Sequence, residues 1–356
     1  MTSTIRRLRK MAIGTGFELF CATGLHRLAA PLTRGCGAVL MLHHVRPWTG
    51  DGFAPNRGLE ITPDYLETVI LTLRDCGFEI IGLDAAIQRL QMPPDAQSRP
   101  FAVLTFDDGY RDNLEFALPI LRRHAAPFSL FVTPGFADRT ARQWWVELEA
   151  VVRRLSQISV TIGGERLVYP ANDDAQKSAA AGAIYWRLRG ESEGIPLDIV
   201  GELAAAAGID GRAIIAGQCM DWDEIATIAA DPLCTIGSHS LTHPRLASCA
   251  ASRVRHELEE SRKMLAARLG VPVRHLAYPF GDATSAGPRE FALAADTGYA
   301  SAVTTRPGML YRQHGRHLTA LPRLSVNGGW QSRAALEVLL SGAPFLVWNR
   351  GRRINA

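Results

Sequence analysis

The sequence of 356 residues contains six cysteines, yet no two of them stand close enough to form a CxxC pair. Disulfide-rich secreted domains and cysteine-ligated zinc modules both depend on closely spaced cysteines, so the spacing argues against both classes. We therefore expect free, buried thiols in a reducing compartment and no metal site built from cysteine. The cysteines are Cys21, Cys36, Cys76, Cys219, Cys234 and Cys249.

The chain also lacks a strong excess of charge of either sign. Its formal net charge is +4, and residues 1–35 hold six basic residues against one acidic residue, so the rest of the chain carries about −1. Nucleic-acid binding needs a basic face on the fold itself, because the phosphates must be neutralised. We therefore expect no nucleic-acid partner. The hydrophobic content of 47% is ample for the core of one large α/β domain or two smaller ones.

The N-terminal segment resembles a signal peptide only superficially. Basic residues at 6–10 precede an apolar stretch at 11–25, but Glu18 interrupts that stretch, which is shorter than the roughly 20 apolar residues that span a membrane. This segment either contacts an anionic membrane through residues 5–28 or packs on the domain's own surface. We expect a cytoplasmic protein, attached peripherally to the inner face of the membrane if the first alternative holds. Helical spacing places five side chains on one face, namely Ile13, Phe17, Phe20, Cys21 and Leu28.

From residue 36 onward, short apolar strands alternate with amphipathic helices, which predicts an α/β fold with a mainly parallel sheet or barrel. Thr62, Pro63 and Gly77 mark one helix, with threonine as its cap, proline at its first position and glycine at its end. The alternation breaks at about 138–217, where a hairpin turning at Gly163–Gly164 and an alanine-rich helical segment predict an insertion. We expect strands at 39–42, 78–81, 101–106, 128–133, 233–236, 275–278, 299–304 and 322–326. The predicted domains are a basic amphipathic helix at 1–35, a main domain at 36–345 that contains the insertion, and a basic tail at 346–356.

Two motifs follow the ends of predicted strands. Asp107 and Asp108 come directly after one strand, and His239 and His243 come shortly after another. Residues beyond the carboxyl ends of strands converge on one face of an α/β fold. Asp-Gly alone would predict only a turn, and an isolated HxxxH is often a coincidence. Together, however, these residues offer three metal ligands and one spare carboxylate, which predicts a divalent-metal site suited to amide hydrolysis.

Residues next to these motifs have expected supporting roles. Ser240 and Thr242 lie between the two histidines and are expected to orient the rings through hydrogen bonds. Another strand end carries Leu276-Ala277-Tyr278-Pro279-Phe280-Gly281, where proline and glycine predict a rigid loop. The backbone N–H near Phe280 is expected to stabilise a developing oxyanion, although the segment alone would also suit an ordinary strand-terminating turn.

These motifs resemble those of the polysaccharide deacetylases, the NodB-homology family or carbohydrate esterase family 4. Thr105-Phe106-Asp107-Asp108-Gly109 matches the family's first motif, and His239-Ser240-Leu241-Thr242-His243 matches its second. The resemblance implies a distorted (β/α) barrel, a divalent metal that is commonly zinc, and removal of N-acetyl groups from an amino-sugar oligosaccharide, polysaccharide or glycan precursor. By position, it makes Asp107 the general base and Asp108, His239 and His243 the metal ligands.

The sequence departs from the family pattern in two places. Ala277 stands where the third motif usually has an arginine, and residues 321–326 lack the late histidine that supplies the general acid. His43, after the first predicted strand, matches the permuted arrangement of poly-N-acetylglucosamine deacetylases and is the expected acid, with His44 as the alternative. Both histidines could also be structural residues that flank a strand end. Arg323 is expected to replace the charge of the missing arginine.

Several further residues are expected to shape the cleft, although Asp112 could instead cap a helix and single tryptophans more often belong to the core. Two functional alternatives remain open. One is a hydrolase of a non-sugar linear or cyclic amide, and the other is a catalytically silent glycan-binding homologue, against which the complete aspartate and histidine set argues. The residues expected to shape the cleft are Tyr110, Arg111 and Asp112, which continue the first motif, and the tryptophans Trp144, Trp145 and Trp222.

Overall fold

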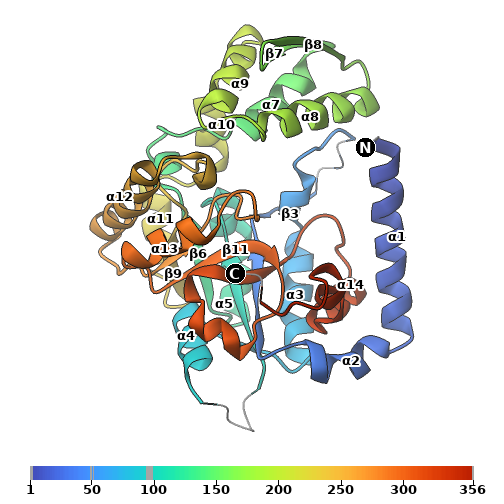
Figure 1. Ribbon diagram of the computed structural model, residues 1–356, viewed down its shortest axis with the longest axis vertical. Coiled ribbons are helices and arrows are strands. Elements are labelled where there is room, and N and C mark those ends of the chain that lie inside the picture. Colours follow the sequence, from blue (N-terminus) through green and yellow to red (C-terminus); the bar gives the residue numbers. More distant parts are fainter. Residues whose placement is uncertain (1–2, 49, 51, 94–98, 355–356) are drawn as a thin grey trace.

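The computed structural model describes the backbone of residues 3–48, 50, 52–93 and 99–354, and the side chains of these ranges from residue 13 onward. Seven parallel strands form a closed barrel surrounded by helices (Figure 1). β1 pairs with β12 on one side and with β5 on the other, which closes the ring in the order β1-β12-β11-β10-β9-β6-β5. This confirms the predicted α/β class and the distorted barrel. The barrel strands are β1 (Gly37–Leu42), β5 (Phe101–Phe106), β6 (Phe128–Val132), β9 (Cys234–Ser238), β10 (His275–Ala277), β11 (Ser301–Pro307) and β12 (Leu321–Ser325).

β1, β5 and β6 are buried along their whole length, which is why they read as nearly continuous apolar runs in the sequence. Side chains alternate along a strand, so that one set fills the barrel and the other packs against the helices. The interior is filled tightly, because a Cβ added to Gly237 would lie 2.4 Å from the Phe131 ring. One buried cluster contains Val39, Val103, Phe131, Val303 and Leu321, and the other contains Leu40, Leu104, Leu130 and Leu324.

Seven helices between residues 63 and 340 cover the barrel. α3 (Pro63–Asp75) begins as predicted, because the Thr62 hydroxyl accepts a hydrogen bond from the Tyr65 N–H at 3.2 Å. It ends before Gly77, whose φ of +82° is a left-handed conformation that glycine adopts without strain. A short strand, β4 (Glu79–Ile80), then pairs with the start of β5. The other covering helices are α4 (Leu83–Gln91), α5 (Leu118–Arg123), α11 (Trp222–Ala229), α12 (Ala251–Leu269), α13 (Pro288–Asp296) and α14 (Arg333–Leu340).

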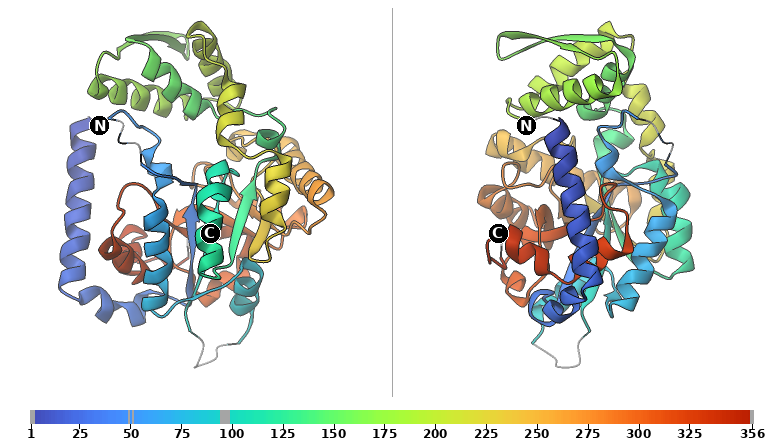
Figure 2. Two further views of the ribbon diagram at one scale, coloured as in Figure 1. Left: turned by 180° about the vertical axis from the view of Figure 1, so that it is seen from behind. Right: turned by 90° about the vertical axis from the view of Figure 1, so that its right-hand side faces the viewer.

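Residues 138–217 form a separate layer over one end of the barrel (Figures 1 and 2). They supply most of a second buried apolar cluster, to which Phe53, Tyr110, Phe136 and Cys219 also belong. The hairpin turns at Gly163 and Gly164, as predicted. The alanine-rich segment is helical, as predicted, and forms two helices, with Gly194 (φ +93°) at the start of the second. The elements are α7 (Trp144–Arg154), β7 (Gln157–Ile162), β8 (Glu165–Pro170), α8 (Asp174–Leu188), α9 (Ile195–Ala206) and α10 (Gly211–Gln218).

The N-terminal helix α1 (Ser3–Ala22) runs along the side of the barrel, and α2 (Leu25–Thr33) lies at its lower end and runs at an angle to it (Figure 1). Phe17 is buried, and Ile13, Phe20 and Cys21 pack against the main core, whereas Leu28 from the same predicted face is exposed. The basic side chains at 6–10 lie outside the described residues. At the other end of the chain, α15 (Ala343–Trp348) extends into the predicted tail. Within the described residues, no helix combines the length and apolar character that crossing a membrane requires.

All six cysteines are free, as predicted, but only Cys219 and Cys249 are buried, so the prediction of burial was wrong for the other four. Cys21 lies with His26 and Glu337 at distances that would suit a metal ion. Arginines already pair with both carboxylate oxygens of Glu337, because Oε1 accepts from Arg333 Nε at 2.8 Å and Oε2 from Arg27 Nη2 at 3.5 Å. We therefore interpret this group as an ion-pair cluster that ties the N-terminal helices to α14.

Candidate active site

Three buried side chains predicted as metal ligands meet at the carboxyl edge of the barrel. Asp108 follows β5, while His239 and His243 belong to the loop after β9. Nε2 of His239 and Nε2 of His243 each lie 3.4 Å from Oδ1 of Asp108. One ion placed between these atoms would contact all three side chains, and they form a group of metal-ligand type.

The backbone of these loops is locally strained. Seven non-glycine residues of the described chain have a positive φ, and four of them, Asp108, Ser240, His243 and Phe280, belong to the loops around the site. Non-glycine residues adopt this conformation rarely, and such strain concentrates at functional sites because the surrounding structure must hold it in place. The tight loop, rather than a helical turn, brings the two histidines together.

The chemistry of the donor set fits a divalent cation. Oδ1 of Asp108 is buried without a hydrogen-bond partner in the described structure. Burial, and next the charge of Asp107, raise the pKa of Asp108 to about 7, which reflects the cost of an uncompensated negative charge there. Burial also lowers the pKa of His239 and His243, which keeps both rings neutral, as metal ligation requires. A bound cation would therefore relieve the cost of ionising Asp108.

The backbone, and not the neighbouring hydroxyls, orients His239. Its Nδ1–H donates to the Ala277 carbonyl at 2.7 Å, which directs Nε2 towards Asp108. The prediction that Ser240 and Thr242 orient the rings was wrong, because their hydroxyls stabilise the loop instead. Ser240 Oγ accepts from the His243 N–H at 3.0 Å, and Thr242 Oγ1 donates to Glu257 Oε1 at 2.7 Å.

Arg323 forms a fully buried, two-point ion pair with Asp107. Its Nη1 lies 2.8 Å from Oδ1 of Asp107 and its Nη2 lies 2.7 Å from Oδ2, while Nε donates to the Thr304 carbonyl. Burial by itself raises the pKa of Asp107, but the charge and hydrogen bonds of Arg323, together with the nearby His239 and His43, outweigh burial and hold this pKa well below its usual range. The structure thus brings an arginine from β12 to the carboxylate, whereas Ala277 on β10 contributes only its backbone.

Of the two N-terminal histidines, His43 lies at the site. Its Nε2 is 3.9 Å from Oδ2 of Asp107, and burial lowers its pKa to about 4. The next side chain along an extended segment points the opposite way, and His44 accordingly stacks on Tyr110 with ring centroids 3.5 Å apart. Its Nδ1 also lies 2.6 Å from Oδ2 of Asp112, so His44 is a structural residue.

Two polar residues hold this segment in place, a role that sequence reasoning did not predict. Asp112 was expected to line the cleft, which is wrong, because it does not belong to the lining residues. Oδ1 of Asp112 accepts from the Val45 N–H at 3.0 Å, and Nδ2 of Asn113 donates to the His43 carbonyl at 2.7 Å. Asn113 begins a π-helical turn (η2, Asn113–Ala117), a geometry that is frequent at functional sites. Asp112 makes no helix-capping hydrogen bond, so that alternative was wrong. The sequence contains no spacing signal that would have identified either role.

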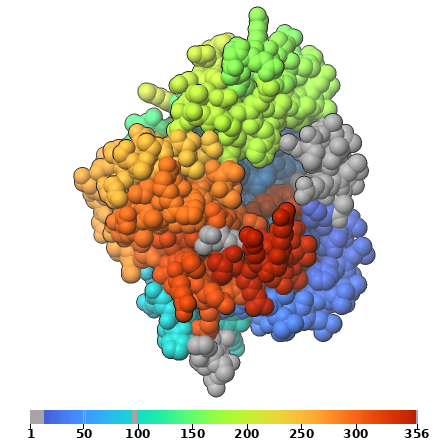
Figure 3. All heavy atoms as spheres, in the orientation of Figure 1, coloured from blue at the N-terminus to red at the C-terminus, as the bar shows by residue number. Residues whose placement is uncertain are grey.

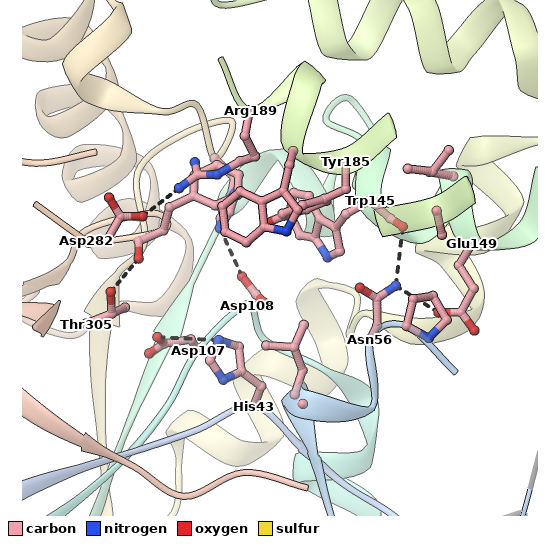
Figure 4. A pocket seen from close by; sticks show the side chains of 18 of the residues that line it. His43, Asn56, Asp107, Asp108, Trp145, Glu149, Tyr185, Arg189, Asp282 and Thr305 are labelled. Atoms are coloured by element: carbon pink, nitrogen blue, oxygen red, sulfur yellow. Dashed lines mark hydrogen bonds and ion pairs between the residues drawn. The ribbon is translucent and has the colours of Figure 1, made fainter. Parts of the chain in front are cut away.

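A cleft of about 580 Å³ lies over these residues, between the barrel edge and the layer formed by residues 138–217 (Figures 3 and 4). Trp145 lines the cleft, as expected. Trp144 is buried behind it, and Trp222 lies outside, where its indole N–H donates to Asp138. Tyr110 is buried beneath His44, and Arg111 pairs with Glu224, so the expectation that these residues line the cleft was wrong. Lining residues that we did not predict are Tyr185, Trp186, Arg189, Asn56 and Glu149.

Phe280 lies at the edge of the cleft next to the metal-ligand group. Its ring centroid is 5.0 Å from that of His243 and 5.6 Å from that of Trp145. Arg189 also contacts Phe280, with its guanidinium 4.2 Å from the ring. Its Nη2 lies 2.6 Å from Oδ2 of Asp282. Among the hydrogen bonds of the described residues, the Phe280 N–H has no acceptor. This donor is thus not used by the other described residues.

Comparison with known proteins agrees with this site. A model of the polysaccharide deacetylase family matches residues 95–166 and 199–301, which include both aspartates and both histidines. No curated protein sequence matches the chain.

Solved structures share the fold at low sequence identity. The Streptococcus pyogenes deacetylase PplD, in complex with acetate, is 16% identical with a TM-score of 0.52, and the similarity covers 82% of this chain and 92% of that one. The putative polysaccharide deacetylase BA0330 from Bacillus anthracis is 16% identical with a TM-score of 0.53, covering 85% and 68%. IcaB from Ammonifex degensii is 16% identical with a TM-score of 0.51, covering 86% and 97%. The sequence match and the barrel together show that the chain belongs to the polysaccharide deacetylase family.

Proposed function

We propose that the protein is a divalent-metal-dependent N-deacetylase that removes acetyl groups from an amino-sugar glycan. The observation that carries this proposal is the orphaned, buried Oδ1 of Asp108, which lies 3.4 Å from Nε2 of both His239 and His243. A divalent ion, zinc in this proposal, would be held by these three side chains, where it would polarise the acetyl carbonyl and lower the pKa of a nearby water. The reaction consumes water and an N-acetyl group and yields acetate and a free amine.

Asp107 is the proposed general base. The charge of Arg323 keeps its carboxylate ionised through neutral pH, and the two-point contact fixes its orientation. A positioned base contributes typically about 10²- to 10⁴-fold to such a reaction. Asp107 contacts Arg323 and is not one of the three proposed metal ligands. Its loss would therefore leave those ligands in place.

His43 is the proposed acid that protonates the leaving nitrogen. Burial lowers its pKa to about 4, so the ring is neutral at pH 7 and must first acquire a proton. Asp107 is the natural donor, because Nε2 of His43 lies 3.9 Å away and the carboxylate is the weaker base of the two. The proton that Asp107 removes from water would thus reach the amine through His43. The N–H of Phe280 is the proposed donor to the oxyanion.

The cleft supports a glycan substrate. Its volume of about 580 Å³ lies within the range of small-ligand sites, which is roughly 300–1,000 Å³. Trp145, Tyr185 and Trp186 provide aromatic faces, and Asn56 and Glu149 provide hydrogen-bonding groups on the same wall. This mixture suits a sugar, which presents apolar C–H faces and polar hydroxyl edges.

Two measurements on the purified chain would test the proposal. The first is zinc binding after treatment with a chelator, measured by titration calorimetry. The second is acetate release from chitooligosaccharides, compared with hydrolysis of small cyclic amides, which separates the glycan substrate from the non-sugar alternative. We expect binding of one zinc ion and metal-dependent release of acetate. Stoichiometric zinc binding without turnover on any acetylated glycan or amide would favour a catalytically silent homologue.

Three variants would assign the roles. His239→Ala should abolish both zinc binding and turnover, while Asp107→Asn should abolish turnover and retain zinc. His256→Ala is the matched control, because this histidine is exposed on α12, and it should change neither quantity. Retention of zinc by His239→Ala would refute the proposed ligand set.

A further inference from the structure

α2 exposes its apolar side chains and buries polar ones, which is the reverse of an ordinary surface helix. Leu28 and Leu32 are 76% and 74% exposed, and Leu25 is half exposed. The buried residues of the helix are polar, with His26 only 3% exposed and Thr33 only 7%. A helix that packs on its own domain normally buries its apolar stripe. The leucines at i, i+3 and i+7 form one such stripe, but it faces away from the protein.

The inward direction of the polar residues is fixed by specific contacts. His26 Nε2 lies 3.6 Å from Glu337 of α14, and Thr33 donates to the Ser341 carbonyl next to α15. The outward direction of the leucines is therefore a consequence of a well-defined packing arrangement. It is not the result of a loosely attached helix.

α15 extends the same apolar surface. It packs against α2, and its Val347 and Trp348 are 78% and 44% exposed. Trp348 also contacts Phe17 of α1, with ring centroids 6.4 Å apart. Leu19 of α1 is exposed as well, so that α1, α2 and α15 hold six of the eleven exposed large hydrophobic residues among those described. We call the set Leu19, Leu25, Leu28, Leu32, Val347 and Trp348 the α2–α15 face.

The charges around the α2–α15 face are mainly positive. Arg27 flanks the leucine stripe with an exposed side chain, and exposed Arg350, Arg352 and Arg353 follow α15 directly. Arg353 is close to the face, because its Nη2 lies 3.2 Å from the Leu32 carbonyl. The nearby Glu337 is buried and already paired with arginines. Apolar side chains with arginines beside them complement the acyl chains and anionic headgroups of a lipid surface.

We propose that the α2–α15 face docks the protein peripherally on an anionic lipid bilayer. The leucines, Val347 and Trp348 would enter the boundary between headgroups and acyl chains, and the arginines would contact the phosphates. A second copy of the chain fits less well, because an isologous contact would place these arginines against their own copies. This contact differs from the one expected from the sequence, since Ile13, Phe17, Phe20 and Cys21 pack inward and leave the outer side of α2 for the membrane. The inference does not depend on the proposed reaction.

The test is co-sedimentation of the full chain with vesicles of phosphatidylcholine alone or mixed with phosphatidylglycerol. We expect binding to the anionic vesicles that weakens as salt is added, because screening reduces only the arginine contribution. The double variant Leu28→Glu/Leu32→Glu should lose at least tenfold in binding. Arg350→Gln/Arg352→Gln should lose roughly 25-fold in binding on anionic vesicles alone, since each basic residue contributes about fivefold. Val168→Glu is the matched control, because Val168 is 52% exposed on β8, and it should bind like the unmodified chain.

Thermal unfolding and size-exclusion chromatography would distinguish the outcomes. The five substituted positions are exposed, so all variants should unfold at the same temperature as the parent. Binding that survives Leu28→Glu/Leu32→Glu would overturn the proposal, because another surface would then be responsible. Absence of vesicle binding would also overturn it. If the parent chain were in addition a dimer that Leu28→Glu/Leu32→Glu dissociates, the occupant of the face would be a second copy.

Discussion

Replacing Arg323 with methionine would keep the volume of the side chain and remove its charge from the barrel interior. The Asp107 carboxylate would then be buried without its partner, because Arg323 supplies contacts of 2.8 and 2.7 Å to its two oxygens. Breaking a buried, hydrogen-bonded ion pair on one side costs about 3–5 kcal/mol. We expect Arg323→Met to lower the free energy of unfolding at pH 7 by this amount, measured by urea denaturation of the metal-free protein.

A double-mutant cycle separates the pair from effects of shape. Asp107→Asn alone leaves the guanidinium unpaired and should also destabilise the fold, whereas Arg323→Met combined with Asp107→Asn leaves no buried charge at either position. We expect the double variant to be more stable than the sum of the single effects by about 3 kcal/mol. Additivity of the two substitutions within about 0.5 kcal/mol would refute the coupling.

The same substitution has a consequence for activity. Because the charge of Arg323 lowers the pKa of Asp107, its removal should raise this pKa and move the acidic limb of the pH–rate profile to higher pH. Arg323→Lys keeps the charge and loses the two-point contact, so it should move the limb less. An unchanged acidic limb in Arg323→Met would show that the ionisation of Asp107 does not limit the reaction.

Four further predictions follow from the other contacts. His43→Ala should retain zinc and lose turnover at least 100-fold, whereas His44→Ala should mainly lower the unfolding temperature. Zinc titration, acetate release and thermal unfolding measure these effects. The reverse pattern would show that His44 is the acid and His43 the structural residue. Asn113→Ala removes the donor to the His43 carbonyl and should lower kcat roughly tenfold with zinc affinity unchanged, and a wild-type kcat would contradict the positioning role. Burial lowers the pKa of His314 to about 4, so this histidine binds more protons in the unfolded chain than in the folded one below pH 6.5. It should contribute about 3 kcal/mol to the loss of stability between pH 6.5 and 4, and His314→Gln, measured by urea unfolding, should lose less stability than the unmodified chain by about that amount. Zinc at 100 times its dissociation constant should stabilise the metal-free protein by about 2.7 kcal/mol in thermal unfolding, and no stabilisation should appear in His239→Ala.

Much of the fold could be predicted because its signals are local. Thr62, Pro63 and Gly77 delimit α3 through capping and a left-handed end, and Gly163–Gly164 turns the hairpin, since these conformations depend on only a few neighbouring residues. The roles that sequence reasoning missed depend on contacts between distant segments. Asp112 and Asn113 act on residues 43–45, and Tyr185 and Arg189 reach the cleft from the layer above the barrel.

The orientation of α2 is a second feature that local reasoning could not decide. Helical spacing identifies Leu25, Leu28 and Leu32 as one stripe, but it does not say towards which side the stripe turns. The direction of the stripe depends on the ion pair between His26 and Glu337 and on the hydrogen bond between Thr33 and Ser341, and both partners lie some 300 residues later in the chain. The contacts of two polar residues thus determine that the leucines face outward.

The sequence by itself determined the family motifs, the order of strands and helices, and the residues that could ligate a metal, because these follow from residue type and short spacings. The tertiary structure alone decided that Arg323 pairs with Asp107, that His43 faces the site while His44 faces away, and that Trp222 lies outside the cleft. Barrel closure brings the ends of β1, β5, β9 and β12 together, and the alternation of side chains then decides which residues point inward. Distances between segments that lie more than 200 residues apart are set by that closure, and no local pattern encodes them.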